Sequence, residues 1–163
     1  MSEPDNTDKH EAEASLSDHG AAGLGMTRSV KTEFDKQQIM RTIGARLSSS
    51  WPGMVEIVLP FDDSLTQQHG YVHAGIVSTI ADSACGYAAW SVSSPSSEVL
   101  TVEYKVNFLS PAKGSRLVAR GRVVRKGGTL TICAADVFTT ENSVEKLVAT
   151  MLATIRVLGD EGD

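Results

Sequence analysis

The sequence predicts an α+β domain in which an antiparallel sheet of five to six strands wraps around one long central helix. Two observations carry this prediction: an apolar, Ala- and Gly-rich segment from residue 74 to about residue 92, and a run of strand-like segments after it. A helix that is apolar on nearly all sides has to be buried. Strands joined by short turns pair antiparallel. A sheet that curls around the helix satisfies both requirements.

The chain of 163 residues is long enough for one domain with a real core, and 41% of its residues are hydrophobic. Residues 1–30 are polar and acidic, which predicts a disordered leader. We therefore expect one domain over residues 31–158, followed by a short tail over residues 159–163.

Charge, hydropathy and cysteine spacing exclude several kinds of partner. The net charge is −5, and six acidic residues lie within the first eighteen positions, so the rest of the chain is close to neutral and offers no field for nucleic acid. No apolar run approaches the roughly 18 residues of a membrane span, and the N-terminus has no signal-peptide core. Cys85 and Cys133 lack metal-ligand spacing. We expect a cytoplasmic protein with no membrane partner and no metal.

The first element of the domain is predicted to be an amphipathic helix. Its apolar residues recur every four positions, at Ile39, Ile43 and Leu47. Residues 48–50 and the Pro-Gly pair at 52–53 are expected to end it. Residues 54–60 then alternate between apolar and other side chains and predict the first strand.

The central helix follows a loop over residues 61–73, and Asp82 is its only charged residue. Further strands are predicted over residues 100–108, 117–125, 130–139 and 147–157. In the first of these, simple alternation puts one set of side chains on one face (Leu100, Val102, Tyr104, Val106, Phe108) and a second set on the other (Thr101, Glu103, Lys105, Asn107).

Chemistry is expected where the loop meets the central helix. The first turn of a helix leaves backbone N–H groups unsatisfied, which suits a developing oxyanion. Gln67, His69 and His73 add polar side chains in the loop. A lone carboxylate in an apolar helix, Asp82, needs a function or a partner to compensate its burial.

Helix geometry separates the helix-start amide from the Asp82 carboxylate. Ala74 and Asp82 are eight residues apart, which is about 12 Å along the axis and about 80° around it. A single helix therefore cannot present its first-turn amide and this carboxylate to the same carbonyl carbon. If both groups act, two helices must meet about a two-fold axis. The sequence predicts a homodimer or a dimer of dimers.

The residues in this region resemble those of the hotdog-fold thioesterases of the phenylacetate-degradation type and of the related 4-hydroxybenzoyl-CoA thioesterase branch. Residues 73–82, HAGIVSTIAD, match the family pattern of H-G-G, six further residues and then an acidic residue, and residues 101–112 match its second-strand pattern. The resemblance covers about residues 36–157. It implies a hotdog fold and hydrolysis of an acyl- or aryl-CoA, with no cofactor other than the CoA of the substrate.

The resemblance also implies roles for five residues. Asp82 would be the general base or the nucleophile, and the Ala74 amide would be the oxyanion donor. Gln67 would orient the thioester or the water, Thr101 would hold water beside the carboxylate, and His73 would brace the helix start. Two departures from the family are visible: Ala74 replaces the usual glycine, and Gln67 leaves open which branch's mechanism applies.

Further residues are candidates for substrate binding. Gly75 follows the oxyanion donor, and Tyr87 and Trp90 follow Asp82 on the central helix, where they line an acyl pocket or belong to the core. The resemblance implies that a basic turn between two strands meets the CoA phosphates. The alternative interpretation is a turn that is simply exposed to solvent. Its residues are Arg125, Lys126 and Gly127.

Two alternative functions remain open from the sequence. An acyl-thioester dehydratase or hydratase would use a histidine paired with an acid, but the H-x-x-P-G type of loop that carries it is missing. A non-catalytic acyl-CoA-binding domain would keep the fold but would not need Asp82. The carboxylate favours the thioesterase.

Overall fold

The computed structural model describes residues 30–94 and 96–159. The leader predicted over residues 1–30 lies outside them except for Val30, which is buried in a helical segment over residues 30–36. The other elements, in chain order, are α2 (Gln38–Ile43), β1 (Arg46–Trp51), β2 (Met54–Pro60), the short 3₁₀ helix η1 (Asp63–Leu65), α3 (Ala74–Trp90), β3 (Glu98–Phe108), β4 (Arg116–Lys126), β5 (Leu130–Glu141) and β6 (Val144–Leu158).

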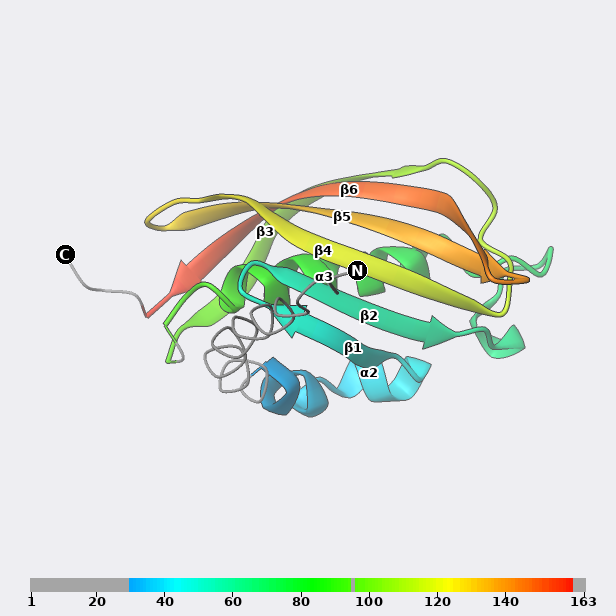
Figure 1. Ribbon diagram of the computed structural model, residues 1–163, viewed down its shortest axis with the longest axis horizontal. Coiled ribbons are helices and arrows are strands. Elements are labelled where there is room, and N and C mark those ends of the chain that lie inside the picture. Colours follow the sequence, from blue (N-terminus) through cyan, green and yellow to red (C-terminus); the bar gives the residue numbers. More distant parts are fainter. Residues whose placement is uncertain (1–29, 95, 160–163) are drawn as a thin grey trace, which may run out of the picture.

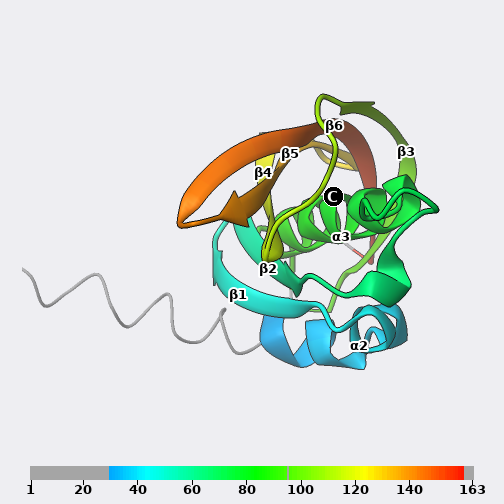
Figure 2. The ribbon, with the colours of Figure 1, turned by 90° about the vertical axis from the view of Figure 1, so that its right-hand side faces the viewer.

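The six strands form one antiparallel sheet in the order β1-β2-β4-β5-β6-β3. Figure 2 shows that the sheet curves around α3, which lies on its inner side. Figure 1 shows the helical segment over residues 30–36 and α2 beside the β1 edge of the sheet. The predicted α+β architecture, with a sheet wrapped around a central helix, is confirmed. None of the described helices is long and apolar enough to cross a membrane.

The core lies between α3 and the inner face of the sheet, and small residues let the two come very close. Ala81, Ala84, Ala88 and Ala89 of α3 are fully buried. On β4, a side-chain carbon added to Gly121 would lie 2.3 Å from the Ala84 carbonyl oxygen. No side chain fits there, so a glycine in β4 and alanines on α3 set the distance between helix and sheet.

The first predicted helix is shorter than expected, and its last turn was assigned wrongly. Gly44 adopts a left-handed conformation (φ 76°) and ends α2 after Ile43. Leu47 therefore lies in β1 and pairs with Ile57 of β2. The Pro-Gly pair at residues 52–53 forms the turn between β1 and β2, where Gly53 also has positive φ. The apolar residues keep their four-residue spacing up to Leu47, but the helix itself ends at this glycine.

The predicted division of β3 into two faces holds from Glu103 onward but is wrong for residues 100–102, because β3 contains a bulge. Thr101 pairs with Ile155 and Glu103 pairs with Thr154, so Val102 is an extra residue on β3. One inserted residue reverses the alternation of side chains. Thr101 consequently points to the inner face, toward α3, whereas Glu103 points outward, where its carboxylate accepts a hydrogen bond from the Thr154 hydroxyl.

Candidate active site

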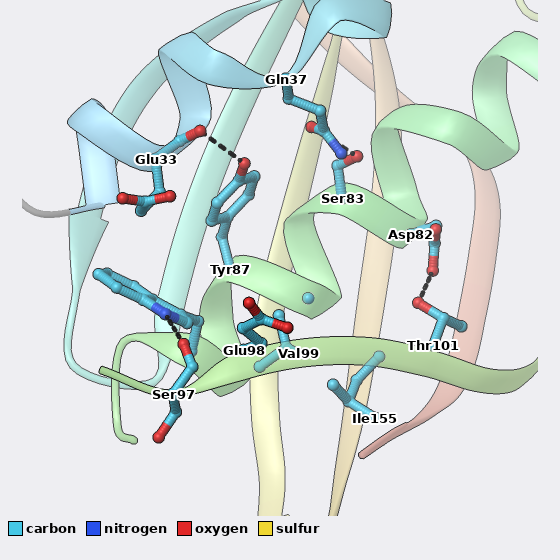
Figure 3. Close-up of a pocket in the computed structure, with 12 residues that line it drawn as sticks. Glu33, Gln37, Asp82, Ser83, Tyr87, Ser97, Glu98, Val99, Thr101 and Ile155 are labelled. Atoms are coloured by element: carbon cyan, nitrogen blue, oxygen red, sulfur yellow. Dashed lines mark hydrogen bonds between the residues drawn. The ribbon is translucent and has the colours of Figure 1, made fainter. Parts of the chain in front are cut away.

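The Asp82 carboxylate lies on α3 and faces β3. The Thr101 hydroxyl donates a hydrogen bond of 2.7 Å to Asp82 Oδ1, as Figure 3 shows. This contact depends on the bulge at Val102, without which Thr101 would point to the outer face of the sheet. Simple alternation put Thr101 on the same face as Glu103, whereas the structure places Thr101 against Asp82.

Burial and the hydrogen bond from Thr101 shift the pKa of Asp82 in opposite directions. Partial burial raises the pKa of the Asp82 carboxyl because it disfavours the charged form, and the hydrogen bond from Thr101 lowers that pKa by a smaller amount. No ion pair joins Asp82 to any of the described residues. The Asp82 carboxylate therefore binds a proton more tightly than an exposed aspartate does, which suits a base.

A cavity of about 340 Å³ opens beside Asp82. One wall comes from the helical N-terminal region, which sequence reasoning did not place near the site. The Tyr87 hydroxyl donates to the Glu33 backbone oxygen at 3.1 Å, and the Ser83 hydroxyl donates to Gln37 Oε1 at 3.3 Å. The first residues that the structure describes thus bind to α3 close to Asp82, at Ser83 and Tyr87.

Trp90 lines the same cavity about two helical turns beyond Asp82. The indole N–H of Trp90 donates to the Ser97 backbone oxygen at 2.8 Å, which fixes the ring. Both aromatic candidates, Tyr87 and Trp90, line the cavity together with Asp82. Both were candidates from the sequence because they are the large side chains that follow Asp82 on the same helix.

The start of α3 carries a free backbone donor. His73 is the N-cap of α3, and its Nδ1 accepts a hydrogen bond of 2.9 Å from the Gly75 N–H. Within the part of the chain that the structure describes, the neighbouring Ala74 N–H has no acceptor. His73, Ala74 and Gly75 are all exposed. An exposed, unpaired N–H at a helix N-terminus can bind an oxyanion.

Gln67 lies near this donor in a tight loop. Its side-chain oxygen accepts a short hydrogen bond from the His69 N–H, and its backbone N–H donates to the Tyr71 oxygen at 2.8 Å. Gln67 and Ala74 line the same hollow, of about 420 Å³, together with residues after β3 such as Leu109 and Pro111. The structure therefore groups Gln67 with Ala74 and, separately, Thr101 with Asp82.

The basic turn between β4 and β5 belongs to neither hollow. The Lys126 ammonium donates to the Val92 backbone oxygen at 2.6 Å, which links the turn to the segment after α3. The Gly127 N–H donates to the Leu130 oxygen at 3.0 Å. Arg125 is exposed. The structure brings none of these three residues to Asp82 or Ala74.

Sequence reasoning missed several residues that line the Asp82 cavity. Gly86 could have been found by its helical spacing of four residues from Asp82, and Ser83 is the chain neighbour of Asp82. Glu33, Gln37 and Glu98 come from other elements, and no local pattern marks them.

The chain is similar to several known proteins. Residues 69–146 match the family model of the thioesterase superfamily. The crystal structure of a thioesterase family protein from Silicibacter pomeroyi is 50% identical and superposes with a TM-score of 0.79, over 80% of this chain and 96% of that one.

Two more distant proteins are also similar. The PaaI protein of E. coli, from the phenylacetic acid degradation operon, is 17% identical with a TM-score of 0.71, over 82% of this chain and 96% of that one; it shares the fold. A protein of Halobacterium salinarum named "Putative esterase" is 28% identical over 140 residues, which are 81% of this chain and 92% of that protein.

Proposed function

Because this chain belongs to the thioesterase superfamily, we propose that it hydrolyses an acyl-CoA or aryl-CoA to a free acid and CoA, using a site completed by two subunits. The observation that carries the proposal is the separation of two half-sites. A carboxylate with a raised pKa, Asp82, lies in one hollow, and a free helix-start amide, Ala74, lies in another.

In the proposed reaction, the thioester carbonyl oxygen accepts a hydrogen bond from the Ala74 N–H of one subunit. In one route Asp82 of the other subunit takes a proton from water, the water oxygen attacks the carbonyl carbon, the C–S bond breaks, and the proton passes to the CoA thiolate. In the other route Asp82 attacks the carbon itself, the C–S bond breaks as the anhydride forms, and water then hydrolyses the anhydride and supplies the proton that the thiolate takes up. Gln67 orients the thioester, and Thr101 holds the carboxylate.

The edge of the sheet favours assembly into a dimer. Strand β3 is the last strand, so one of its backbone edges has no strand partner among the described residues. Large apolar side chains on and just after it are exposed, including Val102 (57%), Tyr104 (47%) and Leu109 (52%). An open, apolar edge strand is a template for pairing with another chain. Pairing of two β3 edges would bring two α3 helices together.

Wild-type protein is expected to release free thiol from acyl-CoAs, and this assay tests the proposed function directly. A panel from acetyl-CoA to long-chain acyl-CoAs, with several aryl-CoAs, would be followed with a thiol reagent, and the mass in solution would be measured by light scattering. Tight binding of acyl-CoA without thiol release would identify a binding domain instead. A monomer that is fully active would contradict the shared site.

Removing the Thr101 hydroxyl is expected to move the acid limb of the pH profile upward. The Thr101 hydrogen bond lowers the Asp82 pKa, so Thr101→Val should raise that pKa further. The base is active only when deprotonated, so the fall of kcat/KM at low pH should begin at a higher pH. At alkaline pH the loss should stay within about tenfold, the value of one hydrogen bond.

The matched control is Thr101→Ser, which keeps the hydroxyl and should keep the wild-type acid limb. An identical acid limb in Thr101→Val and wild type would show that Thr101 does not influence the ionisation that limits the reaction.

A further inference from the structure

Gly86 lies in the middle of α3, where neither backbone conformation nor packing explains a glycine. Glycine in a helix interior is less stable than alanine by about 1 kcal/mol. Gly86 is not among the residues with positive φ. Apart from its chain neighbours and the backbone of its own helix, no atom lies within 4 Å of where its Cβ would be. Gly121, by contrast, is required by the Ala84 carbonyl.

The space left by Gly86 belongs to the cavity beside Asp82. Asp82, Gly86 and Trp90 follow one another at four-residue intervals, so they form a row on one face of α3, with about 6 Å between successive members. All three line the cavity. The glycine therefore makes a notch midway along this row, between the carboxylate and the indole.

The side chains next to the notch are held in place and do not fill it. The Tyr87 hydroxyl is bonded to the Glu33 oxygen, and the Tyr87 ring lies 5.6 Å from the ring of Phe34. The Trp90 indole is bonded to the Ser97 oxygen. Since both aromatic residues are anchored from outside α3, the notch stays open for a group that is not part of this chain's described core.

We propose that Gly86 is a specificity-determining residue that makes room for the acyl group of the thioester attacked at Asp82. This inference rests on the proposed function, because it takes the cavity beside Asp82 as the acyl pocket. The notch widens the cavity one helical turn beyond the carboxylate. It therefore accommodates acyl groups that are wide at this depth, because they carry an aromatic ring or a branch. Narrow straight chains gain less from it.

The test compares Gly86→Ala and Gly86→Leu with wild type on three probes: acetyl-CoA, hexanoyl-CoA and phenylacetyl-CoA. For phenylacetyl-CoA, kcat/KM is expected to fall about tenfold in Gly86→Ala, the effect of a methyl-sized change in a pocket, and further in Gly86→Leu. Hexanoyl-CoA should lose less, and acetyl-CoA, which does not reach the notch, should change least. Gly86→Ala should also raise the melting temperature, because alanine favours the helix.

The control variant is Thr42→Ala, which also raises helix propensity but lies exposed on α2, outside the described cavities. It should leave all three rates unchanged. Three results would overturn the inference. If Gly86→Ala and wild type had equal rate ratios across the three probes, the notch would not be used by the acyl group. A lower melting temperature of Gly86→Ala would show that the glycine is structural, and a change of its oligomeric mass would show that the partner subunit fills the notch. A wild-type protein inactive on every thioester would instead refute the proposed function.

Discussion

Replacing Asp82 by asparagine is expected to abolish most thioester hydrolysis while making the fold more stable. Asparagine keeps the shape of the side chain, and its oxygen can still accept the Thr101 hydrogen bond, but it cannot take a proton or attack a carbonyl. A positioned base contributes about 10²–10⁴-fold to a rate, so kcat should fall by that range. Stopped assays of thiol release over several hours would measure the residual activity.

The stability gain follows from the raised pKa of Asp82. The folded state binds this proton more tightly than the unfolded state does. The free energy of unfolding therefore decreases as the pH rises through the interval between the usual aspartate pKa and the raised one. Above that interval the wild type carries an ionised, partly buried carboxylate, and Asp82→Asn does not. The variant should be the more stable protein at neutral pH, and its advantage should shrink in acid.

Asp136→Asn is the matched control for this experiment. Asp136 lies on β5, accepts a hydrogen bond of 2.7 Å from Thr150 and is 3.5 Å from the Arg122 guanidinium. The same chemical change there should leave hydrolysis near the wild-type rate. If Asp82→Asn retained full activity, or if both variants lost the same fraction, Asp82 could not be the catalytic carboxylate.

Replacing Ala74 by proline is expected to reduce kcat by about 10²–10³-fold, the usual effect of removing one oxyanion-hole donor. Proline removes the N–H at the first position of α3, where helices tolerate it well. The preceding residue, His73, already has φ −59° and ψ 138°, a conformation compatible with a following proline. The fold should therefore survive. Ala74→Gly, which keeps the N–H, should remain active.

Mixing the two inactive variants tests whether the site is shared. In a heterodimer of Asp82→Asn and Ala74→Pro chains, one site would combine the intact carboxylate with the intact amide, and the other would lack both. Random pairing makes half of the dimers mixed, each with one working site of two, so about a quarter of the wild-type activity should return. Refolding the variants together and separately would measure this. If no activity returned above that of the separate variants, both groups would act within one subunit.

The overall architecture follows from local patterns in the sequence. The run of small and apolar residues around Asp82 identified the buried helix, and alternation identified the strands after it, because each period depends only on neighbouring residues. Spacing along one helix also separated Ala74 from Asp82, a result that needs only the rise per residue. Asp82 stood out as the one charge in α3, and the resemblance of residues 73–82 to the family pattern supplied its role.

Tertiary structure decided how that carboxylate is surrounded. The bulge at Val102 turned Thr101 toward Asp82, and no alternation pattern reveals an inserted residue whose register is set by β6. The wall of the cavity joins residues 46 and 54 positions apart, Ser83 with Gln37 and Tyr87 with Glu33. The notch at Gly86 likewise became visible only with its surroundings. The sequence determined which elements form, because their periods are local. The structure alone decided what meets Asp82, because those contacts join residues far apart in the chain.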